Sequence, residues 1–105
     1  MRELLDFNFK GWKVYADFSN GPVPVGTVKS HFTELTRLTL TVQDGPREHE
    51  WSFGSMAWTH QIKDSDDGGP EVTIKRAHGS YDGSYSSDSM MARTDVFILA
   101  PAPKP

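Results

Sequence analysis

The sequence predicts an all-β fold, a small antiparallel barrel or sandwich of about six to seven strands. Apolar and polar side chains alternate with a period of two in residues 35–42 and again in residues 12–18. Thr, Val, Phe and Trp, which favour strands, dominate these runs. Gly, Asn, Asp and Pro residues, which favour turns, separate them at short intervals. Because such alternation divides a strand into a core face and a water face, we expect one antiparallel domain and no long helix.

Each expected strand is an alternating or apolar run that lies between two turn signals. The expected strands lie near residues 4–9, 12–19, 25–32, 36–43, 48–62, 71–79 and 94–100. A single all-β domain is therefore expected over residues 1–100. A Pro-rich extended tail is expected over residues 101–105, because alternating prolines cannot donate hydrogen bonds to a sheet.

The turn Asp44-Gly45-Pro46-Arg47 sets the register of the first long hairpin. It places large apolar side chains on one face in the pairs Leu38 with Phe53, Leu40 with Trp51 and Val42 with His49. Beyond this hairpin the apolar positions change from odd to even numbers. One extra residue would return them to the same face, so we expect a β-bulge near Gly54-Ser55.

The acidic loop at residues 64–70 sets the register of a second hairpin. Its expected pairs are Met56 with His78, Trp58 with Arg76, His60 with Ile74 and Ile62 with Val72. This register places three polar side chains on an otherwise apolar face. The final strand, residues 96–100, is apolar on both faces, which predicts either a central place in the sheet or a covered outer face.

Those three polar side chains, His60, Arg76 and His78, are the candidate catalytic residues. The histidines could act as general acid and base at a barrel mouth, as in a cyclase or isomerase, while Arg76 could bind a carboxylate or phosphate. In the structural alternative, Arg76 stacks on Trp58 and both histidines reach water at strand ends.

Residues 79–89 have the most unusual composition of the chain, a run of Gly, Ser, Tyr and Asp. Tyr offers a large amphipathic contact and Ser and Gly adapt around it, so such runs are typical of binding loops as well as of plain linkers. The candidate binding residues are Tyr81, Asp82 and Tyr85, together with Trp58 in the neighbouring hairpin.

No metal or cofactor site is expected. His60, His78 and Asp82 match no compact zinc-ligand spacing. The acidic run at 64–69 resembles the start of a calcium loop, but Lys75 stands where an EF-hand requires glutamate. The sequence also has no glycine pattern that opens a helix to hold phosphate.

Composition narrows the classes of partner. The chain has no cysteine, which excludes disulfides and thiol catalysis and fits a cytoplasmic protein. The net charge of −3 and the scattered lysines and arginines argue against nucleic-acid binding. No apolar run is long enough for a membrane helix or a signal peptide.

The sequence therefore favours a noncatalytic protein-interaction module that binds another protein or assembles with itself. Roles as a phage structural subunit, an inhibitor or an immunity protein all fit this expectation. The alternative is a small-molecule-binding β-barrel, or an acid-base enzyme that uses His60, Arg76 and His78.

Overall fold

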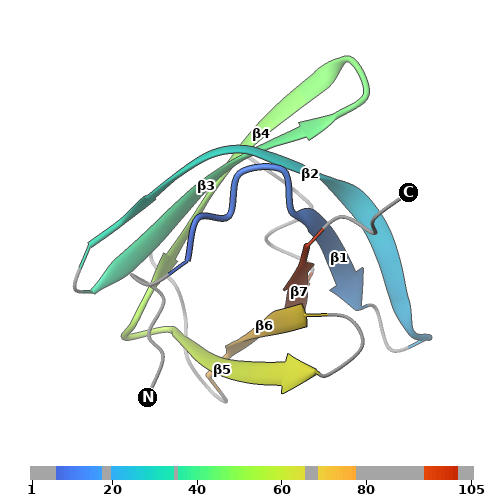
Figure 1. Ribbon diagram of the computed structural model, residues 1–105. Coiled ribbons are helices and arrows are strands. Elements are labelled where there is room, and N and C mark those ends of the chain that lie inside the picture. The colour runs from blue at the N-terminus through green and yellow to red at the C-terminus, as the bar shows by residue number, and fades with distance from the viewer. Residues whose placement is uncertain (1–6, 18–19, 35, 66–68, 78–93, 102–105) are drawn as a thin grey trace.

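The computed structural model describes residues 7–17, 20–34, 36–65, 69–77 and 94–101, and all its strands belong to one sheet (Figure 1). The strands are β1 (Lys13–Asp17), β2 (Pro22–Thr33), β3 (Arg37–Asp44), β4 (Arg47–Gly54), β5 (Trp58–Ser65), β6 (Gly69–Arg76) and β7 (Val96–Ala100). Over these ranges the chain has no helix long and apolar enough to cross a membrane. The all-β prediction is confirmed.

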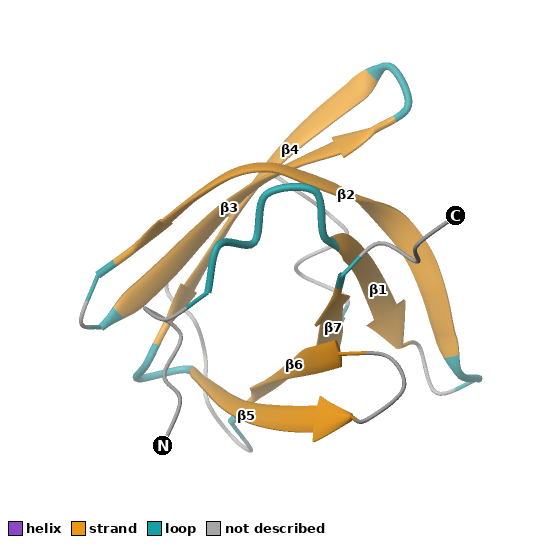
Figure 2. Cartoon of the chain, in the orientation of Figure 1, coloured by secondary structure: helices purple, strands orange, loops and turns teal. Residues whose placement is uncertain are grey.

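The sheet has seven antiparallel strands in the order β4-β3-β2-β1-β7-β6-β5. Strand β7 lies between β1 and β6, which confirms the central position expected for a strand that is apolar on both faces. Strands β4 and β5 are the two edges and do not pair with each other, so of the predicted barrel or sandwich the structure has a single sheet that is not closed into a barrel (Figure 2). After the turn that joins them, these strands run apart, which leaves their backbones beyond hydrogen-bonding reach of each other.

The sheet rolls over so that its two ends share one core. Strand β4 is four places from β7 in the strand order, yet the ring of Trp51 lies 5.0 Å from that of Phe97, and Phe53 lies 5.3 Å from the same ring. Trp58 also packs on Phe97 at 6.0 Å. The inward faces of the strands therefore form a single hydrophobic core, as alternation predicts.

The bend that permits this roll lies in β2, the longest strand. The pairing of β2 with β3 shifts register between Val28 and Ser30. The pairing of β1 with β2 shifts register between Val14 and Tyr15. At the first shift Lys29 is the extra residue, so the alternation of faces changes there. Strand β2 curves across the molecule and pairs with both β1 and β3 (Figure 1).

The β-bulge expected near Gly54-Ser55 is not found; a turn occupies residues 55–57. The Ser55 amide donates to the carbonyl of Thr36 at 2.8 Å, at the start of β3, so β4 has no partner beyond this point. The Ala57 amide then donates to the carbonyl of Gly54 at 3.1 Å. The chain therefore reverses instead of bending, and the strand expected over 48–62 is two strands.

Both hairpin registers are confirmed at the described pairs. Strands β3 and β4 pair Leu38 with Phe53, Leu40 with Trp51 and Val42 with His49. Strands β5 and β6 pair Trp58 with Arg76, His60 with Ile74 and Ile62 with Val72. Met56, expected on the core face, is in the turn and 95% exposed, so that expectation is wrong. Its expected partner, His78, lies outside the described residues.

The N-terminal strand expected over 4–9 is absent from residues 7–9, the part of it that the structure describes. Here the chain forms a loop whose rings pack on one another, with Phe9 4.9 Å from Trp12 and Phe7 5.6 Å from Phe9. The amide of Gly11 donates to the carbonyl of Val28 at 2.9 Å, which ties this loop to β2. The segment adds aromatic side chains to the core without adding a strand. Of the predicted tail, residues 102–105 lie outside the described residues.

Candidate functional site

Of the two described residues of the expected catalytic group, Arg76 makes the polar contacts. It ends β6 directly opposite Trp58, and its guanidinium carbon lies 4.3 Å from the centre of the Trp58 ring. Its Nε donates to Oδ1 of Asp95 at 3.2 Å, and a terminal nitrogen donates to the Thr94 carbonyl at 3.4 Å. The stacking on Trp58 that the structural alternative predicts is confirmed.

These contacts join the ends of two strands. The backbone amide of Arg76 donates to the carbonyl of Asp95 at 2.8 Å, and the next amide, Ala77, donates to the carbonyl of Ala57 at 2.8 Å. The chain therefore leaves β6 and returns to β7 at adjacent points, beside the turn that carries the exposed Met56. We call this group of contacts, made by Arg76 with Trp58, Thr94 and Asp95, the Arg76 clamp.

His60 lies two residues along β5 from Trp58, on the face that alternation assigns to the core, but its side chain is exposed. Ile62, the next residue on that face, is only partly buried. On the core face of β5, Trp58 is thus buried, whereas His60 and Ile62 are more accessible to water. His60 reaches water, as the structural alternative expects.

The other candidate residues are distributed as follows. Trp58 is 4% exposed, and its ring lies between Arg76 and Phe53, which packs edge-on at 5.0 Å. His78, Tyr81, Asp82 and Tyr85 lie outside the described residues. Of the predicted sites, the structure therefore brings together Trp58 and Arg76, while His60 is exposed to water two residues farther along β5.

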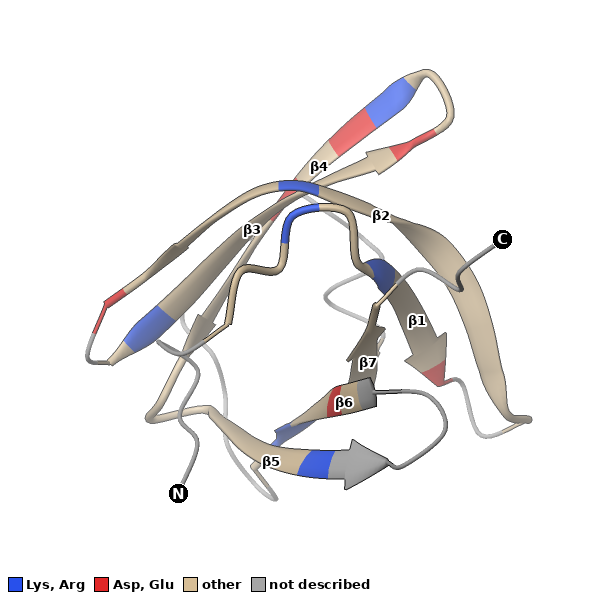
Figure 3. Ribbon diagram, viewed as in Figure 1, with Lys and Arg blue, Asp and Glu red and all other residues tan. Residues whose placement is uncertain are grey.

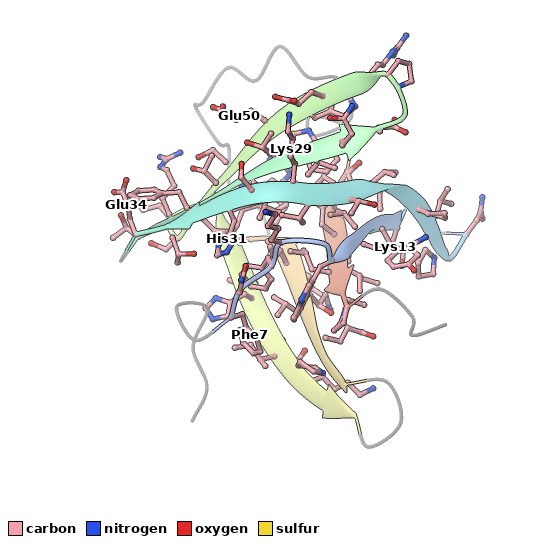
Figure 4. All side chains as sticks on the ribbon, turned by 45° about the horizontal axis from the view of Figure 1, so that its top comes forward. Phe7, Lys13, Lys29, His31, Glu34 and Glu50 are labelled. Atoms are coloured by element: carbon pink, nitrogen blue, oxygen red, sulfur yellow. The ribbon has the colours of Figure 1, made fainter. Side chains whose placement is uncertain are left out.

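A polar contact that sequence reasoning missed joins the N-terminal loop to β2. The ring of His31 lies edge-on to Phe9 at 5.3 Å, and its Nε2 is 3.2 Å from Oδ1 of Asn8. Figure 4 shows His31 and Lys29 leaving β2 on opposite sides, which follows from the register shift between Val28 and Ser30. That shift has no signal in the sequence, so alternation could not assign His31 to the inner face.

The two edge strands differ in the groups that they present. In the β3–β4 hairpin the hydrogen bond from the Ser55 amide to the Thr36 carbonyl identifies the hydrogen-bonded pairs. By alternation the peptides of Glu48, Glu50 and Ser52 face outward from the sheet. Glu48 and Glu50 carry exposed carboxylates, and Glu48 pairs with Lys29 at 2.9 Å. The β4 edge strand therefore carries acidic residues, whose positions are red in Figure 3.

The β5 edge follows the same rule with different side chains. The bond from Ala77 to Ala57 marks a hydrogen-bonded pair, so the peptides of His60 and Ile62 face outward. Pro70, which has no N–H, supports this assignment. It lies opposite Asp64 in a pair that is not hydrogen-bonded, so β5 needs no amide from β6 at this position. Among the described side chains of β5, Lys63 is the only Lys, Arg, Asp or Glu, and it lies opposite Glu71 in β6.

Metal binding finds no support in the described ranges, where no three His, Asp or Glu residues come close enough to hold an ion. No protein-family model, curated protein or solved structure matches this chain.

Proposed function

We propose that this protein is a noncatalytic interaction module that binds another protein or a copy of itself. The observation that supports this function is the filling of the inner face by rings in mutual contact, those of Trp51, Phe53, Trp58 and Phe97. A small-molecule site needs a concave space with several polar groups that converge on it. Here the guanidinium of Arg76 is occupied by Trp58 and Asp95, and His60 points to solvent.

The Tyr/Ser segment, residues 79–89, is the proposed contact surface for a protein partner. The Arg76 clamp holds residues 76–77 and 94–95 together, so the two chain ends that carry this segment have fixed positions. Fixed ends reduce the conformational entropy that a binding segment loses in a complex. Tyr81 and Tyr85 are the proposed anchors, with Asp82 between them. Roles as a phage structural subunit, an inhibitor or an immunity protein all use such a surface, and the cytoplasmic placement is part of this proposal.

The test compares partner capture by two variants. The tagged chain is used to isolate proteins from lysate of its source cell, and the affinity of each purified partner is then measured by titration calorimetry. Replacing both Tyr81 and Tyr85 with alanine should weaken binding by at least about tenfold, because aromatic residues dominate the energy of interfaces. Phe32→Ala removes another exposed ring, 62% exposed on β2, and serves as the control.

Unchanged affinity in the Tyr81/Tyr85 double variant would contradict the proposed surface. Loss of affinity in both that variant and Phe32→Ala would indicate a general effect of lost aromatic surface. A catalytic activity that disappears in His60→Ala, with an unchanged melting temperature, would support the enzyme alternative instead.

A further inference from the structure

The β5 edge can accept an additional strand along its central residues. It is eight residues long and contains no proline. By alternation its outward peptides belong to Trp58, His60, Ile62 and Asp64, and the two central residues, His60 and Ile62, have side chains without a carboxylate or ammonium group. Natural sheets protect their edges with charged side chains, prolines or bulges. The β4 edge has such protection in Glu48 and Glu50, whereas the charged residues of β5, Lys63 and Asp64, lie toward the end of the strand, and the β5–β6 ladder has no bulge.

We propose that β5 pairs with β5 of a second copy, antiparallel and about a two-fold axis, so that the two sheets become continuous. This inference deepens the proposed function, because it names one partner, a second copy of the chain, and the surface that it uses. An antiparallel two-fold contact requires the strand to be complementary to itself. The sequence of β5 meets that requirement with few charges to oppose one another.

The axis is expected to pass beside Gln61. With Gln61 opposite its own copy, the outward peptide of His60 faces that of Ile62 in the second copy, and each exchanges N–H and C=O hydrogen bonds with the other. Thr59 then lies opposite Lys63, so the two lysines are at opposite ends of the contact and do not repel. No other register centred on β5 places the outward peptides of His60 and Ile62 opposite each other.

Side-chain polarity favours a second copy over an acidic or basic peptide. The outward face of β5 presents Thr59, Gln61 and Lys63, and Lys63 lies opposite Glu71 of the adjacent strand. A strand of strong charge would therefore find no complementary row there, whereas the Gln61 amides of two copies can donate to and accept from each other. A contact of one strand pair is small, so we expect a weak, concentration-dependent dimer.

The experiment measures the mass of the full chain by analytical ultracentrifugation as concentration rises. His60→Pro removes an outward N–H from each copy without removing a hydrogen bond to β6, and should raise the dimer dissociation constant by more than about tenfold. Gln61→Lys, at an exposed position, should raise it by at least about fivefold, because two lysines then oppose each other at the axis. Gln61→Glu should have a similar effect.

Two further samples make the test specific. An equimolar mixture of Gln61→Lys and Gln61→Glu should restore dimerisation, because opposite charges then meet at the axis. Glu50→Pro, which removes an outward N–H from the β4 edge, is the matched control and should leave the dissociation constant unchanged. Circular dichroism establishes whether each variant is folded. If His60→Pro does not fold, the dissociation constants of Gln61→Lys, Gln61→Glu and their mixture test the β5 contact.

Several results would overturn the inference. One is a wild-type chain that stays monomeric up to about 1 mM, which corresponds to a binding free energy weaker than about −4 kcal/mol. Another is a dimer that Glu50→Pro disrupts and both Gln61 variants preserve. A monomer that still binds a different protein through Tyr81 and Tyr85 would overturn the β5 contact while it leaves the interaction function intact.

Discussion

The two edge strands have the same length and opposite surroundings. On β4 the inward residues Trp51 and Phe53 are 0% and 4% exposed. On β5 Trp58 is also 4% exposed, but His60, two residues farther along the same face, is exposed to water. The roll of the sheet places Phe97 against the β4 rings of Trp51 and Phe53, and on β5 the ring that packs on Phe97 is that of Trp58. Alternation assigns a side chain to a face, and burial depends on what covers that face.

The edges of the same two strands differ in their charge. Lys29 and Glu48 pair on the outer surface of the β4 end, and Glu50 stands beside them (Figure 4). At the β5 end of the sheet, Arg76 and Asp95 form an ion pair. This pair lies where the chain leaves β6 and enters β7, and it does not lie on the outward edge of β5. Charge therefore protects an edge at one end of the sheet and fixes the backbone at the other.

The largest expected effect concerns the covered and the open inward faces. Trp51→Ala should lower the free energy of unfolding by about 3–5 kcal/mol, because it leaves a large cavity against Phe97. Ile62→Ala, at a partly buried position on β5, should cost about 1 kcal/mol, because water already reaches that site. Urea denaturation of both variants measures the difference, and equal losses would show that the two faces are covered alike.

A smaller effect is expected where β2 crosses from one half of the sheet to the other. A Cβ on Gly26 would lie 2.5 Å from Cγ1 of Val42 and 2.8 Å from the carbonyl oxygen of Gln43. Gly26→Ala should therefore destabilise the fold by about 1–3 kcal/mol through overpacking. Gly54→Ala, whose Cβ would be 3.4 Å from the flexible Arg37 side chain, is the control and should change stability little. Thermal unfolding of the two variants tests the close approach, which a tolerated Gly26→Ala would exclude.

The smallest expected change in the free energy of unfolding distinguishes the Arg76–Asp95 ion pair from the Lys29–Glu48 ion pair. Arg76→Met keeps an apolar stem over Trp58 but loses the cation–π contact and the bond to Asp95, so we expect a loss of about 1–2 kcal/mol. Lys29→Met, in a pair whose side chains are 60% and 51% exposed, should change the free energy of unfolding by about 0.5 kcal/mol or less. Hydrogen exchange at the Arg76 amide provides a local readout. Protection that is unchanged in Arg76→Met would mean that the backbone hydrogen bonds hold this region without the guanidinium.

The local features of the fold were predictable because they are local. Asp44-Gly45-Pro46-Arg47 supplies a tight turn, and the alternation on either side permits one register that keeps Trp51 and Phe53 on the apolar face. The same argument located Arg76 opposite Trp58, from which their stacking follows. Asp95 could not be predicted as the third member of the Arg76 clamp, because 18 residues separate it from Arg76 in sequence and only the pairing of β6 with β7 joins them.

By itself the sequence determined that this protein is built of antiparallel strands and how each hairpin pairs, since these depend on side-chain period and turn geometry. Only the tertiary structure decided that β7 inserts between β1 and β6, that β2 bends at Lys29, and that β4 and β5 stay apart as two unlike edges. These features depend on contacts between residues far apart in the chain, which a local pattern does not encode. His60 shows the consequence, because its position in the pattern is that of a core residue and its surroundings in the rolled sheet are those of the surface.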